Sequence, residues 1–308
     1  MPQGELVALG ALSLASLQLG QVPGTAWLLL TVAGVVVLVD LFVAWQERRP
    51  ETALRTLGWN LLLPGIVVGA VVLLAPSKPA LWLQILMTVG LVMPLGPMIY
   101  RLAFQPIANA PVLVLMIVAI AVHFVLVGLG LVFFGAEGFR TTPIVEAQFR
   151  VGALTVSAQS LWVLGVVVAM IAALYAFFER TLYGKALRAT AVNRIGARLV
   201  GVSTAFAGKL SFGLAALIGV ISGILVSPLT TIYYDTGFLI GLKAFVAAII
   251  GGLVSYPLAA LGAVLVGLLE SYSSFWASPY KEVIVFTLII PVLIWRSLTS
   301  QVIEDEQD

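Results

Sequence analysis

One almost uninterrupted apolar tract, VLVLMIVAIAVHFVLVGLGLVFF (112–134), limits the folds open to this chain. About 20 apolar residues in a helix cross the hydrocarbon core of a bilayer and satisfy their own backbone hydrogen bonds. A transmembrane barrel would alternate apolar and polar residues, and this tract does not. With 61% hydrophobic and 10% charged residues and a mean hydropathy of +1.11, the chain has a membrane protein's composition. We therefore predict an all-α, polytopic transmembrane helical bundle.

Apolar stretches of similar length recur along the chain and predict about eight to ten spans in a single transmembrane domain, residues 1–308. They cover residues 5–20, 26–44, 60–75, 80–99, 111–134, 161–178, 206–226, 238–254, 256–270 and 283–296. The N-terminal MPQGEL lacks a basic region before an apolar core, so no removable signal peptide is expected. The absence of cysteine excludes disulfides, thiolate metal sites and cysteine catalysis.

Basic residues assign sides to the loops, because cytoplasmic loops carry an excess of Lys and Arg. The basic loops are 46–56, 99–106 and 179–203, and an even number of predicted spans separates each pair. This pattern predicts that all three loops and the C-terminal tail are cytoplasmic. The loop 135–160, in which acidic and basic residues balance, is predicted to lie outside.

Ionisable residues within predicted spans are costly, so they are functional candidates unless their position explains them. Asp40, Lys209 and Glu270 lie near span ends, which predicts anchoring at the interface. Lys243 lies deeper and is a candidate for the pathway or for helix pairing. His123 is the sole histidine, with no cysteine or nearby carboxylate to complete a metal shell, so a hydrogen bond to the backbone of a neighbouring helix is expected. No catalytic residue, metal site or cofactor is predicted.

Small residues four apart allow helices to approach closely in lipid. Two such stripes are Ser211, Ala215, Gly219 and Gly223, and Ala259, Ala263 and Gly267. They predict helix contacts, although Ala and Gly are also simply common in membrane spans. The candidates for helix packing or for the pathway are Gly219, Gly223, Lys243, Gly251 and Gly252.

The stretch YGKALRATAVNRIGARLVGVS (183–203) is unusually basic for this chain. As one continuous helix it would gather small residues on one face, with the basic residues on the other, together with Val192, Ile195 and Leu199. The small residues are Ala186, Ala189, Asn193, Gly196 and Ala197. Such a bare face suits close docking of another protein, although the basic residues could also serve topology only. A break at Asn193 and Gly196 would give two short helices instead. No phosphate-binding loop motif occurs, so nucleotide binding is expected in another subunit.

Two blocks, GKALRATAVNRIGARLVGVS (184–203) and GLKAFVAAIIGGLVSYPLAALGAVLVGLLES (241–271), resemble LivH-type permease subunits of branched-chain amino acid ABC importers. TVSAQSLWVL (155–164) is also similar in its place. The resemblance implies an ABC importer permease fold in the bacterial inner membrane, and import of Leu, Ile and Val. It also implies as partners a second permease subunit, related or identical, two ATP-binding cassette subunits that hydrolyse ATP, and a periplasmic substrate-binding protein. No nucleic acid partner is implied.

In that family the first block is the cytoplasmic segment that couples to the ATPases. The resemblance assigns this coupling role, within residues 179–205, to Gly184, Leu187, Arg188, Ala189, Asn193, Ala197, Arg198, Leu199 and Gly201. Arg188 and Arg198 are the candidates for polar contact with the ATPase surface. Alternatives are a related importer of urea, amides or other amino acids, and, from a different class, a self-sufficient carrier or channel.

Two departures from the family pattern carry expectations of their own. PQGELVALGAL (2–12) resembles the family's NFAQGE or NFAHGE stretch, which ordinarily follows a first transmembrane helix, so we expect that such a helix is missing at the N-terminus. Residues 40–95 exceed the short connection expected between early helices and predict an accessory hairpin.

Overall fold

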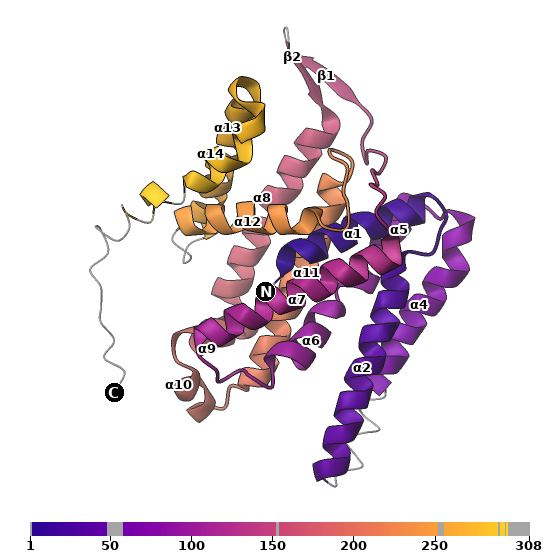
Figure 1. Cartoon of the computed structure of the whole chain (residues 1–308), viewed down its shortest axis with the longest axis vertical. Helices are drawn as coiled ribbons and strands as arrows, with labels where there is room; N and C mark the ends of the chain where they lie inside the picture. The colour runs from indigo at the N-terminus through magenta and orange to yellow at the C-terminus, as the bar shows by residue number, and fades with distance from the viewer. Residues whose placement is uncertain are drawn as a thin grey trace. The chain divides into compact units, whose positions relative to one another are not determined.

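A computed structural model describes residues 2–47, 58–151, 154–251 and 256–288, together with 290–292 and 294. Within these ranges the chain is predominantly helical, which confirms the predicted helical bundle (Figure 1). It divides into two compact units, residues 1–238 and residues 239–308.

The first unit holds most of the helices. In chain order they are α1 (Gln3–Gln18), α2 (Gly24–Glu47), the π-helical turn η1 (Gly58–Leu62), α4 (Leu63–Leu74), η2 (Ala75–Ser77), α5 (Leu81–Val92), α6 (Leu95–Ile99), the π-helical turn η3 (Tyr100–Phe104), α7 (Val112–Phe134), α8 (Ala158–Arg180), α9 (Leu182–Val192), α10 (Arg194–Leu199) and α11 (Thr204–Val226). The helix α12 (Thr236–Ile250) begins in the first unit. The second unit continues with α13 (Tyr256–Trp276), η4 (Ser278–Tyr280) and α14 (Lys281–Thr287).

Seven helical segments in the described ranges are long and apolar enough to cross a membrane, and each overlaps a predicted span. They are Gly24–Gln46, Asn60–Ser77, Leu81–Phe104, Val112–Phe134, Ala158–Arg180, Thr204–Val226 and Pro257–Trp276. The predicted spans at 5–20 and 238–254 correspond to the shorter helices α1 and α12. The chain is thus a multi-pass membrane protein.

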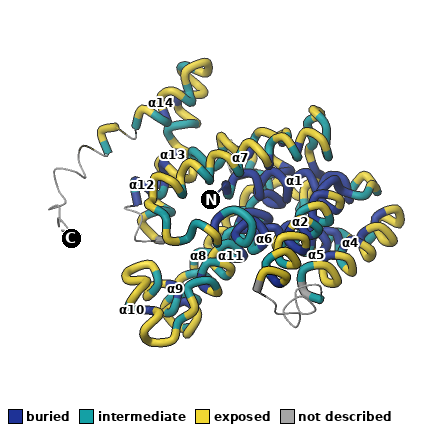
Figure 2. Tube along the Cα trace, turned by 60° about the horizontal axis from the view of Figure 1, so that its bottom comes forward, coloured by how far each residue is buried: buried dark blue, intermediate teal, exposed yellow. Residues whose placement is uncertain are grey.

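The core of the first unit forms around α1, which is buried at every position from Gly4 to Leu17 (Figure 2). It packs against α5, α7 and α11. Gly219 and Gly223 of the first predicted stripe lie at the contact with α1, where a Cβ on Gly219 would come within 3.1 Å of Leu6 Cβ. A Cβ on Gly223 would overlap the carbonyl oxygen of Val7. Small residues therefore bring these two backbones together.

The second predicted stripe packs only in part inside its own unit, because Ala259 lies against Gly251 but the other two members do not pack. Ala263 and Gly267 are exposed, whereas Gly262 and Val266 are buried. A Cβ on Gly262 would overlap the carbonyl oxygen of Ala247, so the face of α13 that meets α12 includes Gly262 rather than Ala263. Spacing identifies small residues but does not select the face that packs.

Gly251, at the end of α12, lies against the backbone of Ala259 in α13. A Cβ on Gly251 would overlap that backbone, so the two chain segments approach closely here. The prediction for Gly252 falls outside the described residues.

Loop 135–160 contains a short antiparallel hairpin that the sequence did not predict. β1 (Gln148–Val151) pairs with β2 (Leu154–Ser157), and Gln148 lies opposite Ser157. The loop before the hairpin is held to the end of α11, where Thr141 Oγ1 lies 2.7 Å from Ser227 Oγ. The hairpin joins the N-terminal end of α8, and α9 and α10 follow the opposite end (Figure 1).

Candidate functional site

The segment 183–203 forms two short helices that meet at Asn193. Asn193 has an extended backbone (φ −147°, ψ 106°), and its side-chain Oδ1 accepts a hydrogen bond from the Gly196 amide at 2.8 Å. This is the geometry of an Asn N-cap, which begins a new helix. The interpretation as one continuous helix is therefore wrong, and the alternative of a break at Asn193 is confirmed.

A tight turn joins α8 to α9. Thr181 Oγ1 accepts a hydrogen bond from the Gly184 amide at 3.0 Å and donates one to the Phe177 carbonyl oxygen at 2.6 Å. Gly184 is buried, and a Cβ there would overlap the Phe177 carbonyl. The glycine thus allows the first turn of α9 to lie against the last turn of α8.

At the other end, Gly201 stops α10. It has a φ of +86°, its amide donates to the Arg198 carbonyl at 3.0 Å, and the Val202 amide donates to the Ala197 carbonyl at 2.9 Å. A left-handed glycine after the last turn is a common helix terminator. Gly201 therefore has a local structural role beside any role in coupling.

The predicted bare face of small residues is not the surface that the segment exposes. Ala197 is buried, and Ala186 and Gly196 are half-buried, while Ala189 and Asn193 remain exposed. The break at Asn193 separates the faces of α9 and α10, so residues that a single helix would align are no longer aligned.

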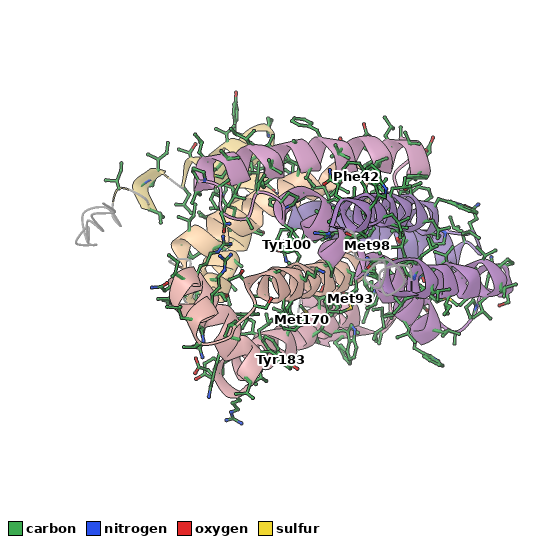
Figure 3. All side chains as sticks on the ribbon, turned by 90° about the horizontal axis from the view of Figure 1, so that it is seen from below. Phe42, Met93, Met98, Tyr100, Met170 and Tyr183 are labelled. Atoms are coloured by element: carbon green, nitrogen blue, oxygen red, sulfur yellow. The ribbon has the colours of Figure 1, made fainter. Side chains whose placement is uncertain are left out.

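Large apolar side chains between residues 182 and 200 are exposed instead, and we call them the exposed apolar set (Tyr183 in Figure 3). The set consists of Leu182, Tyr183, Val192, Ile195, Leu199 and Val200. Val192 is 88% exposed and Leu199 83% exposed. Exposed apolar groups beside basic ones are typical of an interaction surface. The helical projection placed Val192, Ile195 and Leu199 beside the basic residues, but only Leu199 was assigned a role, because the prediction relied on the small residues.

Both arginines proposed for polar contact have partners within the chain. Arg188 donates to Glu179 Oε1 and to the Phe178 carbonyl oxygen, each at 2.6 Å. Arg198 Nε donates to Thr204 Oγ1 at 3.1 Å. Both arginines are exposed, whereas Leu187, directly before Arg188, is buried. They therefore shape the segment itself in addition to presenting charge.

Asp40 and Glu270, for which anchoring at the interface is predicted, each have a charged partner within the chain. Asp40 Oδ1 lies 2.5 Å from an Arg101 guanidinium nitrogen, and Glu270 Oε1 lies 2.5 Å from Lys243 Nζ. Lys209, by contrast, is exposed near the start of α11. Pairing offsets the cost of keeping these charges near the apolar region.

His123 has a carboxylate partner, so the predicted backbone hydrogen bond is wrong. Its Nδ1 lies 2.6 Å from Glu5 Oε1 of α1, with the two side chains 14% and 6% exposed. The Phe238 ring lies 4.8 Å from the imidazole, between centroids. Glu5 is 118 residues away in the chain, so no local sequence signal joins the pair. Among the described residues no three His, Asp or Glu side chains gather as a metal site would require.

Glu5→Ala is expected to lower the free energy of unfolding by about 1–3 kcal/mol, because it leaves the partly buried His123 side chain without its partner. Glu5→Gln keeps a side-chain oxygen that accepts from the imidazole, so it should cost clearly less. Thermal unfolding of the purified protein in detergent measures both. Equal losses for the two variants would show that the hydrogen bond contributes nothing.

Comparison with known proteins places these features in a family. Residues 2–293 match the family described as "Branched-chain amino acid transport system / permease component". The chain is 30% identical over 208 residues to the "High-affinity branched-chain amino acid transport system permease protein LivH" of Escherichia coli K12, covering 65% of this chain and 67% of that protein. It is 29% identical over 251 residues to the "Probable branched-chain amino acid transport permease protein LivH" of Methanocaldococcus jannaschii, covering 74% and 78%.

A third relative is the "High-affinity branched-chain amino acid transport system permease protein BraD" of Pseudomonas aeruginosa, 34% identical over 122 residues, which cover 39% of this chain and 40% of that protein. No solved structure matches the chain.

Proposed function

The chain belongs to the family of permease components of branched-chain amino acid transport systems, and from this premise we propose that it imports Leu, Ile and Val across the bacterial inner membrane. The family match over residues 2–293 carries the proposal. Seven apolar helices in the described part of the chain, each long enough to span a bilayer, support a translocating role. The two compact units would act together as one permease domain.

ATP hydrolysis takes place in separate subunits in this proposal. Two ATP-binding cassette subunits, a second permease subunit, related or identical, and a periplasmic substrate-binding protein complete the importer. Segment 179–205 and the C-terminus face the cytoplasm, as the basic loops predict. The extra helices of 40–95 form the accessory hairpin.

The coupling role is assigned to α9 and α10. Their exposed apolar set supplies the surface that an ATPase would cover, and Arg188 and Arg198 border it. Closure of the ATPases would push on α10 and shift the bundle between inward and outward access. Ala189 and Asn193 are exposed in the same segment, whereas Gly184, Leu187 and Ala197 would act by holding the segment's shape.

Two features within the spans are assigned as well. Gly219 and Gly223 hold α11 against α1, as Gly251 holds α12 against α13. Lys243, paired with Glu270, serves helix pairing or the pathway.

Reconstitution tests the proposal. The chain is placed in liposomes with the ATPases, second permease and binding protein encoded beside it, and uptake of labelled leucine is measured with ATP and with ADP. We expect uptake with ATP only, and none for the chain alone. Gradient-driven leucine flux by the chain alone would contradict the proposal. ATP-driven uptake of urea but not of leucine would support an ATP-driven importer with a different substrate.

A further inference from the structure

Asp40 of α2 joins two π-helical turns that are far apart in the sequence. Its Oδ1 accepts from Arg101 Nε of η3 at 2.7 Å, and its Oδ2 accepts from Asn60 Nδ2 of η1 at 3.3 Å. The Asp40 side chain is 11% exposed and that of Arg101 24%. One partly buried carboxylate thus fixes both turns to the end of α2.

A second set of contacts joins the coupling segment to the loop that follows η3. Arg194 of α10 donates to the Ala108 carbonyl oxygen, and Arg198 donates to Asn109 Oδ1 at 3.4 Å. Residues 105–111 run directly from η3 to the start of α7. A displacement of α10 would therefore pull on this loop, and through it on η3.

The helix that follows the coupling segment contacts η3 as well. The Phe212 ring of α11 lies 5.1 Å from Tyr100 and 5.0 Å from Phe104, between centroids (Tyr100 in Figure 3). A Cβ on Gly208 of α11 would overlap the Tyr100 ring. Thus η3 is held on one side by α11 and on the other by Asp40.

The junction between η3 and the loop has features of a hinge. The Gln105 amide donates to the Tyr100 carbonyl oxygen at 2.8 Å, the wide hydrogen bond of a π turn, and such turns are frequent at functional sites. Gln105 Oε1 is buried and has no hydrogen-bond partner among the described residues. A buried acceptor without a partner is costly, and a rearranged turn could satisfy it.

We propose that Asp40 is a positioning residue for transport: its bridge to Arg101 and Asn60 passes the displacement of α10 through η3 to α2 and to the accessory hairpin. α2 and α4 lie side by side, so the pair would move together (Figure 1). Without the charge on Asp40, α10 still receives the push of the ATPase, but η3 slips against α2. This inference rests on the proposed function.

The test compares leucine transported per ATP hydrolysed in the complete reconstituted importer. Asp40→Asn removes the charge and keeps the shape, and we expect the ratio to fall about tenfold, within the usual range of coupling between sites. ATP hydrolysis should persist, and Asp40→Glu should restore most of the ratio. Thr31→Val is the matched control, because Thr31 is exposed on the same helix and bonds only its own turn, at the Leu28 carbonyl.

Asn109→Ala is the second variant. Asn109 is exposed in the loop, so its removal should not unfold the protein, and it should lower the same ratio by loss of the contact with Arg198. An unchanged ratio in this variant overturns the inference, even if Asp40→Asn fails to assemble. Equal losses of hydrolysis and uptake in Asp40→Asn would also overturn it. Absence of leucine uptake by the unmodified importer would instead contradict the proposed function.

Discussion

Leu199→Asp is expected to abolish ATP-dependent leucine uptake while the protein remains inserted in the membrane. Leu199 is 83% exposed in α10 and belongs to the exposed apolar set. Covering a leucine side chain contributes about 1.5–3 kcal/mol, and burying a carboxylate in its place carries a further cost. Affinity for the ATPase subunits should therefore fall about a hundredfold or more. Co-purification of the ATPases and uptake in proteoliposomes measure the two effects.

Phe149→Asp is the matched control for assembly. Phe149 lies in β1 of the hairpin and is also exposed, so it tests whether a new carboxylate on an exposed apolar position by itself disrupts the complex. ATPase subunits should still co-purify with this variant. If Leu199→Asp retains them equally well, α10 is not the docking site.

Gly223→Ala is expected to destabilise the protein by about 1–3 kcal/mol, the usual cost of overpacking, and Gly223→Leu by more. The added Cβ would overlap the Val7 carbonyl oxygen and lie 2.9 Å from the Ala11 amide nitrogen. Both atoms belong to the backbone of α1, so no side-chain rotation relieves the clash. Thermal unfolding of the purified chain in detergent measures the change.

Gly165→Ala provides the comparison within a helix interior. Gly165 lies in α8 with no atom within 4 Å of an added Cβ. Alanine at this position is expected to stabilise the folded protein by about 0.5–1 kcal/mol, because it reduces the conformational freedom of the unfolded chain. Similar effects of the two substitutions would contradict a close crossing of α1 and α11.

The spans could be predicted from sequence because membrane insertion depends on local composition. The predicted span 111–134 corresponds to α7 at Val112–Phe134, and 206–226 to α11 at Thr204–Val226. An apolar run and its length are both local properties. The family blocks at 184–203 and 241–271 are local as well, and the family match agrees with them.

The candidate site was predicted less completely. The break at Asn193 was one of two alternatives, since Asn is a good N-cap but also tolerable within a helix. The orientation of α9 and α10 depends on Gly184 against Phe177 and on Arg194 against the loop at Ala108. Neither contact leaves a sequence pattern, so the exposed apolar set could not be distinguished from lipid-facing residues.

The sequence by itself determined that this chain is a membrane bundle, where most of its helices lie, and which family it resembles. Only the tertiary structure decided the partners of its polar groups. Glu5 meets His123, and Asp40 meets Arg101, across 118 and 61 residues of chain. Hydropathy acts residue by residue along the chain, whereas a hydrogen bond or an ion pair requires two groups within about 3 Å. That proximity exists only after the helices have packed.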